Sequence, residues 1–284
     1  MPSGKQPTVR MRRIGSALRQ AREAKGMKLS TACRLYGRSA GWFSTVENGT
    51  QAVTPYELAD LLDFYEVSDG LLRESLLHLA QQPRLKGWQR PYEGRISAAA
   101  LDLMSLECES RLVRAFHPTI IPGLLQTKDY ARALFEVGNP VYSGRTPALL
   151  DFRMDRQKVL TGPNPPEFMA VIHESVLHHQ MGSASVMQAQ LRQLAEWAHW
   201  PHVHIHVLPF SKSAYLGLSE SFLLLTLRPP GTLTVAVLEH LARSLFVDNE
   251  EELARFIKVF DRLFGAALGE GESLKLLEGV ASHA

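Results

Sequence analysis

The sequence predicts two domains: an all-α N-terminal domain built around a helix-turn-helix, and an α+β C-terminal domain with a small, mostly antiparallel sheet. The chain has 284 residues, whereas one compact domain usually has about 100–200. Residues 27–49 have the pattern of two short helices joined by a tight turn, and strand-like alternation appears only after residue 97. We expect a disordered basic tail over residues 1–11, a helix-turn-helix domain over 12–80, a linker over 81–97 and the α+β domain over 98–284.

The helix-turn-helix is the most informative part of the chain. An amphipathic helix over 29–36 ends at Gly37, which can take the left-handed conformation that a tight turn between helices requires. Ser39 follows at the N-cap of a second helix, where its hydroxyl can accept a hydrogen bond from a free backbone N–H. Phe43 and Val46, three positions apart, are expected on the inner face of this helix.

The outer face of the second helix is expected to read DNA, because such a helix fits the major groove and presents its N-terminal residues to base edges. The candidate base contacts are Ser39, Ala40, Gly41, Ser44 and Thr45. The candidate phosphate contacts are Arg38 and Asn48. Trp42 is expected either to contact a thymine methyl or sugar, or to pack against the second domain.

Positive charge is concentrated around this motif. Residues 1–38 contain ten Lys or Arg and one acid, Glu23, although the net charge of the whole chain is only +2. A basic segment beside a DNA-reading helix is what the release of phosphate counterions requires. A solvated helix face with a basic tail would have the same composition, but beside a helix-turn-helix we favour DNA contact.

The other elements of this domain follow from hydrophobic periodicity. The first helix has Ile14, Leu18 and Ala21 on one face. A later helix starts at Pro55, because proline is favoured at the first helical position. Its apolar stripe is formed by Leu58, Leu61, Leu62 and Tyr65. A further helix covers about 70–80, after which prolines and glycines between 81 and 94 break the helical pattern and indicate a linker.

Residues 14–77 resemble the Xre, or phage-repressor, type of helix-turn-helix, and in particular the actinomycete regulators related to WhiJ. The resemblance is carried by Leu29, Ala32, Cys33, Tyr36, Gly37 and Ser39, followed by Phe43, Ser44, Thr45, Val46, Glu47 and Gly49. The chain departs from these relatives at Trp42 and Thr45, where they usually have Lys and Arg. Two contacts to phosphate or base that the resemblance implies are therefore absent.

In the C-terminal domain, periodicity predicts helices over 98–112, 128–137, 147–160, 185–199 and 250–268. The last is the clearest, with six apolar residues on one stripe: Leu253, Phe256, Ile257, Phe260, Leu263 and Phe264. Alternation predicts strands over 168–173, 202–208, 221–227 and 234–239. Because the strands come late and between helices, we expect an α+β fold.

This region resembles the large domain of uncharacterised function that follows the helix-turn-helix in WhiJ-type regulators. The resemblance is carried by PTIIPGLLQTKDYARAL (118–134), FRMDRQKVLTG (152–162), HESVLHHQMG (173–182), MQAQLRQL (187–194), HVHIHVLPF (202–210) and FDRLFGAALGEGESLKLL (260–277). The chain departs from the family after 208–210, where Ser-Lys-Ser-Ala replaces a glycine-rich turn. The resemblance implies a small co-encoded partner protein, in an arrangement likened to antitoxin and toxin.

Six residues of this domain are candidate ligand or partner contacts: Gln126, Tyr130, Arg153, Arg156, Gln157 and Glu174. Gln126 lies among apolar neighbours and must find hydrogen-bond partners, so we favour a clamp within the core over a ligand contact. Thr127 is expected to cap the helix that contains Tyr130. Arg153, Arg156 and Gln157 share one side of a helix, where they would pair with Glu174, with an acidic partner, or in a structural salt bridge.

His202, His204 and His206 alternate along a predicted strand, and all three are expected on one face. They could bind zinc with His178, His179 or His199, but three successive residues on one face of a strand spread too far for one ion. We favour a polar sheet surface that is rich in histidine. The sequence has no phosphate-binding glycine loop, G-x-S-x-G elbow or H-E-x-x-H motif, so we expect a binding domain with no catalytic residue, metal or cofactor.

The sequence also indicates a cytoplasmic protein. Residues 1–13 are polar and basic and lack the apolar stretch of a signal peptide, and no run approaches the roughly 18 apolar residues of a membrane span. Cys33 and Cys108 lack the spacing of metal ligands. We expect both to be small buried residues, with redox sensing at Cys108 as the alternative.

Together these observations predict a transcriptional regulator that binds double-stranded DNA as a homodimer, because one reading helix covers only a few base pairs. Its C-terminal domain is expected to bind a small ligand or a partner protein that tunes DNA binding. The first alternative is an antitoxin-like partner-binding protein with weakened DNA specificity, which Trp42 and Thr45 suggest. The second alternative is a metal-dependent enzyme built on the histidine strand.

Overall fold

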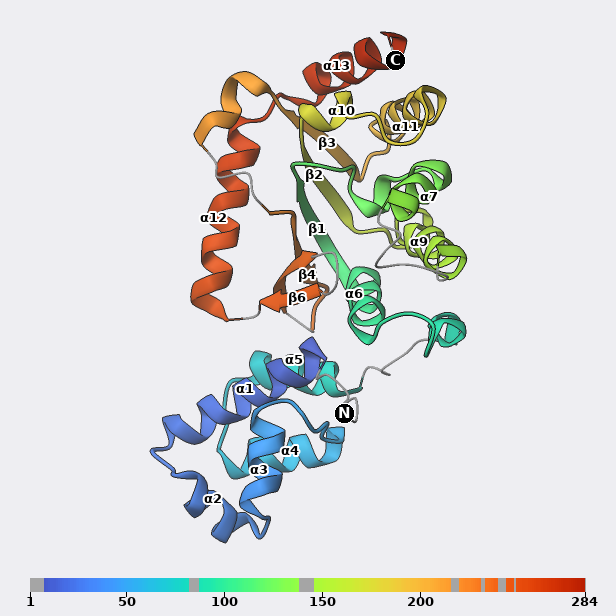
Figure 1. Cartoon of the computed structure of the whole chain (residues 1–284). Coiled ribbons are helices and arrows are strands. Elements are labelled where there is room, and N and C mark those ends of the chain that lie inside the picture. The colour runs from blue at the N-terminus through green and yellow to red at the C-terminus, as the bar shows by residue number, and fades with distance from the viewer. Residues whose placement is uncertain are drawn as a thin grey trace. The chain divides into compact units, whose positions relative to one another are not determined.

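The computed structural model describes residues 8–81, 87–137, 146–215, 220–230, 233–239, 244–247 and 249–283. The chain divides into two compact units, residues 1–88 with 228–233 and residues 89–227 with 234–284. Residues 8–81 contain only helices as regular structure, whereas the second unit combines helices with a mixed sheet (Figure 1). The predicted fold class is therefore confirmed.

The helices of the first unit are α1 (Val9–Ala24), α2 (Leu29–Tyr36), α3 (Ala40–Glu47), α4 (Pro55–Phe64) and α5 (Gly70–Gln81). Helix α1 begins earlier than predicted, because the Thr8 side chain caps it by accepting a hydrogen bond from the backbone N–H of Met11. Residues 9–11 of the predicted tail are therefore helical, and residues 1–7 lie outside the described part of the chain.

The core of the first unit is apolar, as the periodicity predicted. Ile14 and Leu18 of α1 are buried, and so are all four residues of the stripe predicted for α4. Helix α4 starts with a capping box in which Thr54 and Glu57 satisfy each other's backbone N–H groups. Local sequence signals therefore define this helix start completely.

The second unit contains six strands and the remaining helical segments. The strands are β1 (Ser110–His117), β2 (Glu167–His173), β3 (Val203–Leu208), β4 (Phe222–Leu227), β5 (Thr234–Glu239) and β6 (Ser244–Val247). The α-helices are α6 (Ala98–Glu109), α7 (Lys128–Val137), α9 (Thr146–Thr161), α10 (Ser175–His178), α11 (Ala184–Trp197), α12 (Glu250–Ala266) and α13 (Glu270–His283). The 3-10 helices are η1 (Gly87–Tyr92), η2 (Gly123–Leu125) and η3 (Phe210–Tyr215).

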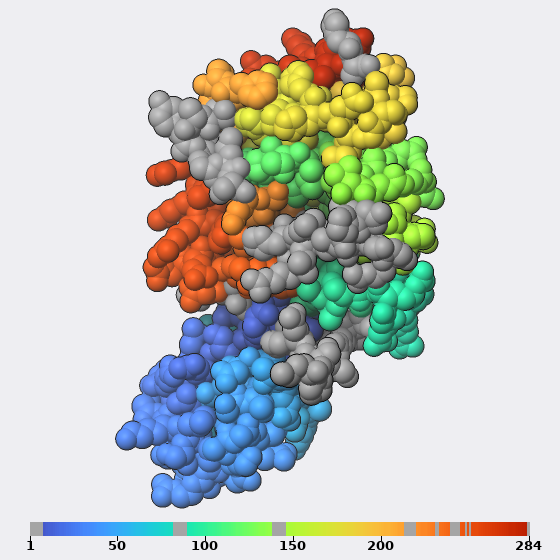
Figure 2. Space-filling view, viewed as in Figure 1, coloured from blue at the N-terminus to red at the C-terminus, as the bar shows by residue number. Residues whose placement is uncertain are grey.

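The strands form one mixed sheet in the order β3-β2-β1-β4-β5-β6. β1, β2 and β3 run parallel, with Phe116 of β1 opposite Val171 of β2, whereas β4, β5 and β6 pair antiparallel. Helix α12 covers one face of the sheet and α6, α7, α9 and α11 lie on the other (Figure 1), and the two layers are also seen on the surface in Figure 2. The apolar stripe of α12 packs on the first face, as predicted.

Several elements of the second unit differ from the sequence prediction. The helix expected over 98–112 ends at Glu109, and the chain continues directly as β1, the central strand of the sheet. No glycine or proline marks this junction, and Leu112 continues the helical spacing, so the pattern gave no stop signal. Strand β6 and helix α13 were not predicted either, because β6 has four residues and α13 contains Gly271 and Gly279.

Part of the predicted linker belongs to the packed second unit. Residues 82–86 lie outside the described part of the chain, and residues 87–92 form η1. Tyr92 is buried, packs edge-on against Phe152 of α9 and donates a hydrogen bond to Asp155. The second half of the linker is thus held by α9.

Candidate nucleic-acid interface

The turn between α2 and α3 has the geometry that the sequence predicted. Gly37 has φ of 80° and ends α2 in the left-handed conformation. The Ser39 hydroxyl then accepts a hydrogen bond of 3.1 Å from the backbone N–H of Trp42, which starts α3. Because the end of α2 and the start of α3 are both fixed by local contacts, the short turn between them sets the direction of α3 relative to α2.

The inner face of α3 is held by packing and by a buried ion pair. Phe43 and Val46 are almost fully buried. Glu47 accepts two hydrogen bonds from Arg22 of α1, at 2.7 Å to Nε and 2.9 Å to Nη2. Arg22 also donates to the carbonyl oxygen of Met27 at 2.8 Å. Glu47 was predicted only to lie at the end of this helix, so the bidentate pair with Arg22 was not predicted.

Two glycines allow α1 to approach the end of α3 closely. A Cβ atom on Gly15 would lie 2.4 Å from the carbonyl oxygen of Val46. A Cβ on Gly49 would lie 2.6 Å from the Cα of Arg12, and Gly49 also has a positive φ of 67°. Side chains at these positions would push α1 and α3 apart. The frame behind the outer face of α3 is therefore rigid.

The outer face of α3 presents small polar groups to solvent. Ala40, Gly41 and Ser44 are exposed, and Thr45 is half-buried. Asn48 is also exposed and donates to the Ser44 hydroxyl at 3.3 Å. A surface of this kind lets a helix approach base edges closely and offers both donors and acceptors.

Gln51 is a further polar residue beside this face, and it was not among the predicted DNA contacts. Its side-chain oxygen lies 3.0 Å from the Thr45 hydroxyl, which also lies 2.8 Å from the carbonyl oxygen of Trp42. Gln51 is exposed and follows the end of α3. An amide at this place is an additional candidate for base recognition, because amides can form paired hydrogen bonds with adenine.

Trp42 lies at the edge of this face and is half-buried. Its ring stacks on Tyr36 at 6.1 Å with an interplanar angle of 15°, and meets Phe43 edge-on at 5.1 Å. The Arg38 guanidinium lies 5.2 Å above the Trp42 ring. Burial, assisted by a hydrogen bond to Asp60, raises the pKa of Tyr36, which therefore stays neutral in this stack.

The charge of the first unit is divided between its two halves. Residues 8–51 contain nine Lys or Arg and two acids, whereas residues 52–81 contain one Arg and six acids. The positive half therefore carries α3, which favours approach to phosphates.

The ten basic residues expected to flank DNA are not all on the surface. Arg10 and Arg22 are buried, and Arg12 and Arg13 are half-buried. Lys5 lies outside the described residues. The exposed cations are Arg19, Lys25, Lys28, Arg34 and Arg38. Arg38 lies 3.6 Å from Glu57, and both side chains are open to solvent, so this pairing is weak.

In the second unit, Gln126 is the centre of a polar network. Its side chain is fully buried, donates to the carbonyl oxygen of Ile121 at 2.8 Å and accepts from Arg153 at 2.6 Å. Its backbone oxygen accepts from Gln157 at 2.6 Å. These bonds fix residues 122–127, which we call the PGLLQT segment. The predicted clamp within the core is thus the arrangement that the structure has.

Two further residues complete the network. Thr127 caps α7 by accepting from the backbone N–H of Tyr130, as predicted, and Tyr130 is buried. Gln190 of α11 was missed: it is fully buried, accepts from the N–H of Thr127 and donates to the carbonyl oxygen of Leu125, both at 2.7 Å. Gln126, Tyr130 and Gln190 therefore hold elements together and present little surface to a ligand.

Of the partners considered for Arg156, Glu174 was wrong. Arg156 does not pair with Glu174; it forms a buried, bidentate salt bridge with Glu107 of α6, at 2.6 and 2.9 Å. Glu174 instead accepts the backbone N–H of Phe210 at 2.8 Å. The residues are brought together by the packing of α6 on α9, which helical spacing does not reveal. Of the alternatives considered for Arg156, the structure therefore has the salt bridge within the fold.

The three histidines around β3 do not share one site: His204 and His206 approach the same carboxylate, Glu270, at 2.7 and 3.9 Å, but His202 does not. His204 lies between Glu270 and Glu167, at 2.7 and 3.0 Å, and His206 contacts the carbonyl oxygen of Leu268 at 2.9 Å. His202 precedes the strand and contacts the carbonyl oxygen of Leu160 in α9. The prediction that His202 lies on the same strand face as His204 and His206 was therefore wrong. Among the described residues, no group of His, Cys, Asp or Glu has the arrangement of a metal site.

Two expectations about composition can be compared with the structure. Within the described part of the chain, neither Cys33 nor Cys108 forms a disulfide, and both are half-buried rather than buried. No helix in the described part of the chain is long and apolar enough to cross a membrane.

Two family models match the chain. One is described as a helix-turn-helix domain and covers residues 13–76; the other is a domain of unknown function (DUF5753) that covers residues 100–279, more than half of the chain. No curated protein and no solved structure matches it. The first match coincides with the geometry around α3 and indicates a DNA-binding regulator. A helix-turn-helix followed by a domain of unknown function is what the resemblance implied.

Proposed function

The chain belongs to the DUF5753 family, and from this premise we propose that it is an Xre-type transcriptional regulator. It binds double-stranded DNA through α3, and its second unit binds a ligand or partner protein that alters this binding. The second unit acts by binding rather than by catalysis. Its proposed place of action is the cytoplasm.

The observation that carries this proposal is the contrast between the two faces of α3. Its inner face is fixed to α1 by the Arg22–Glu47 pair and by the close approach at Gly15. Its outer face exposes Ala40, Gly41 and Ser44 at the N-terminal end of the helix. A rigid frame with a small polar outer face suits insertion into the major groove.

We propose that the protein binds as a homodimer. Helix α3 has only eight residues and reaches a few base pairs, which gives little specificity alone. Two copies on half-sites about 34 Å apart would double the recognised sequence. Analytical ultracentrifugation with and without operator DNA measures this directly, and a strictly monomeric complex contradicts it.

The test of DNA binding is the salt dependence of affinity. Fluorescence anisotropy with a duplex selected from a random pool should show affinity falling steeply from low to physiological salt, because bound phosphates release counterions. Arg38→Glu should weaken binding to all duplexes. Arg255→Glu, an exposed change in α12, is the matched control and should leave affinity unchanged. A flat salt response, or equal effects of the two changes, would overturn the proposal.

A second candidate is an antitoxin-like protein that has exchanged specific DNA recognition for partner binding. The observation that favours it is the aromatic stack of Trp42 on Tyr36, which places an apolar surface where the resemblance implies a cation. In this case the pool selection should yield no preferred sequence. Pull-down with the tagged full chain should recover a small partner, and Trp42→Ala should release it.

Regulation requires a coupling between the two units. Whatever binds the second unit must change DNA affinity, and DNA must change its binding by the same factor. Removal of the second unit should leave DNA binding intact but unresponsive. If removal abolishes binding and fusion to an unrelated dimeriser restores it, the second unit serves for assembly rather than sensing.

A further inference from the structure

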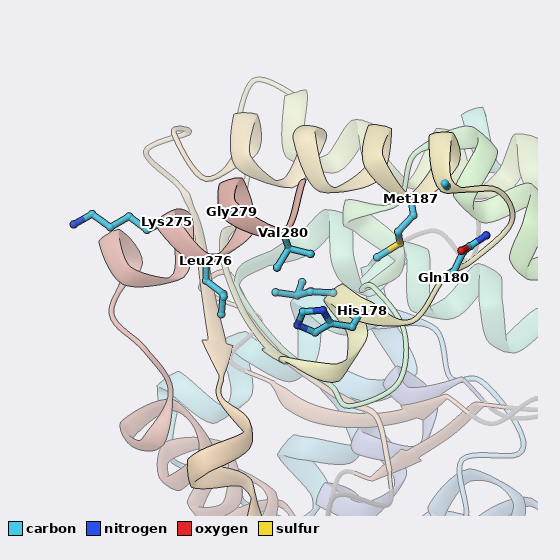
Figure 3. A pocket seen from close by; sticks show the side chains of 9 residues that line it. His178, Gln180, Met187, Lys275, Leu276, Gly279 and Val280 are labelled. Carbon is cyan, nitrogen blue, oxygen red and sulfur yellow. The ribbon is translucent and has the colours of Figure 1, made fainter. Parts of the chain in front are cut away.

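A cavity of about 640 Å³ lies in the second unit between α10, α11 and α13. It is separate from the PGLLQT segment and from the histidines of β3. Its size falls within the range of about 300–1,000 Å³ that is usual for small-molecule sites. Figure 3 shows the lining side chains, which come from residues 177–187 and from α13, two segments far apart in the sequence.

The walls of the cavity are mainly apolar. Leu177 of α10 and Met187 of α11 are almost fully buried, and Leu276 and Val280 of α13 face them as half-buried residues. Gly279 also lines the cavity, and a Cβ atom there would have no atom within 4 Å. The space beside α13 is thus open to an apolar group of a ligand.

The polar groups of the cavity are basic or neutral. His178, Gln180 and Lys275 line it, and none of its described lining residues is Asp or Glu. The imidazole of His178 lies centrally, whereas the Lys275 side chain extends outward at the rim (Figure 3). Behind His178, the Oε1 atom of Glu174 lies 4.0 Å from the imidazole Nε2, and the Oε2 atom of the same carboxylate accepts a hydrogen bond from the backbone N–H of Phe210.

From this arrangement we propose that the cavity binds a small amphipathic organic anion. Its hydrocarbon part lies against Leu177, Met187 and Val280, and its carboxylate accepts a hydrogen bond from the His178 imidazole, with the Lys275 ammonium as the cation at the rim. This proposal names the class of ligand that would bind the second unit. Only the effect of that ligand on DNA binding rests on the function proposed above.

Hydrogen bonds connect the helices around the cavity to other parts of the second unit, so a bound ligand could affect those parts. Helix α13 is tied to β3 by Ser273, which accepts from the N–H of Val207 at 3.0 Å, and to α11 by a bond from Gln188 to Ala281. Helix α11 is in turn bonded to the PGLLQT segment through Gln190. A ligand between α13 and α11 therefore adds contacts at a junction of the domain.

Titration calorimetry of the full chain with decanoate tests the site. Wild-type protein should bind one decanoate per chain, and decanol, which lacks the charge, should bind more weakly. Gly279→Phe should weaken decanoate binding by about tenfold or more, because the added ring occupies the cavity. Gly271→Phe, on the same helix and also without atoms within 4 Å, is the matched control and should bind as wild type.

Two further variants keep the test valid if Gly279→Phe does not fold. Ala184→Phe fills the cavity from α11 and should have the same effect. Lys275→Glu should weaken decanoate binding by about threefold or more but leave decanol binding unchanged, whereas Lys258→Glu in α12 should change neither. Absence of saturable decanoate binding overturns the proposal, and so does binding that neither cavity-filling variant weakens.

DNA binding is measured separately on the same samples. If decanoate binds in the cavity but leaves DNA affinity unchanged, the site stands and the proposed regulation fails. If DNA affinity shows its salt dependence while no decanoate binds, the DNA-binding function stands and the ligand class is wrong.

Discussion

Helix α3 in the first unit and the PGLLQT segment in the second both carry polar side chains on short, capped stretches of chain, but they use them in opposite ways. On α3, Ser44 and Asn48 face solvent and bond mainly to each other. In the PGLLQT segment, Gln126 is buried and its amide bonds to two other parts of the domain. The first arrangement leaves hydrogen-bonding groups available to a partner, and the second consumes them in holding the fold together.

The difference arises from what surrounds each polar residue. Around α3, the apolar residues lie on one side of the helix, so the other side stays in water. Around Gln126, apolar residues precede it and helices α7, α9 and α11 pack over it. A buried amide must satisfy every donor and acceptor within the protein, so it becomes a structural clamp.

The largest expected effect on stability comes from breaking the buried Arg156–Glu107 salt bridge. Arg156→Met should destabilise the second unit by about 3–5 kcal/mol, because Glu107 is left as a buried charge without its partner. Urea unfolding followed by tryptophan fluorescence measures it. The control Arg132→Met removes the exposed pair with Asp129 and should cost about 0.5 kcal/mol or less. A similar small loss for Arg156→Met would mean that Arg156 is available to a ligand.

The next effect concerns the rigid frame behind α3. Gly15→Ala should destabilise the first unit by about 1–3 kcal/mol, because its Cβ would clash with the backbone of Val46 and separate α1 from α3. Thermal unfolding followed by circular dichroism measures the change. Gly41→Ala is the control on the outer face: its Cβ meets only the Ser39 hydroxyl at 3.9 Å, so it should stabilise α3 by up to about 1 kcal/mol. Equal effects would show that the frame tolerates separation.

Trp42 sharpens the comparison because it is half-buried: part of its ring packs within the first unit and part is exposed to a partner. Trp42→Lys should cost about 1 kcal/mol, since it removes the ring contacts with Tyr36 and Phe43. It should also strengthen DNA binding, because it adds a cation at the end of α3. Thermal unfolding and fluorescence anisotropy measure the two effects. A loss above about 3 kcal/mol, or weaker DNA binding, would place Trp42 with the structural residues instead.

The smallest expected effect is the pH dependence of His204. Burial lowers its pKa, but hydrogen bonds to Glu270 and Glu167 more than offset this and raise it overall. The charged form is therefore favoured in the folded state, so its stabilisation is complete below the unfolded pKa of about 6.5 and is lost as the pH rises through the folded pKa. His204→Gln should remove this fall, which we expect to be about 1 kcal/mol or less. Glu270→Gln should reduce it, and identical pH profiles of wild type and His204→Gln would contradict the assignment.

The sequence by itself determined the features that depend on neighbouring residues. Gly37, Ser39 and Pro55 act on their own backbone or on the next turn, so they set the helix-turn-helix and the start of α4 correctly. The stripe of α12 and the cap at Thr127 were predicted for the same reason. The fold class and the exposed face of α3 followed from these local signals.

Only the tertiary structure decided the features whose partners lie far along the chain. Arg22 meets Glu47 across 25 positions and Arg156 meets Glu107 across 49, and neither spacing marks the pair in the sequence. Residues 110–112 of β1 were predicted as helix and the rest of the strand was not predicted, because its place in the sheet depends on pairing with β2 and β4, which outweighs local helical spacing. The cavity beside α13 likewise exists only because three separate helices meet there, and a helical pattern specifies which face is apolar but not which other helix it will contact.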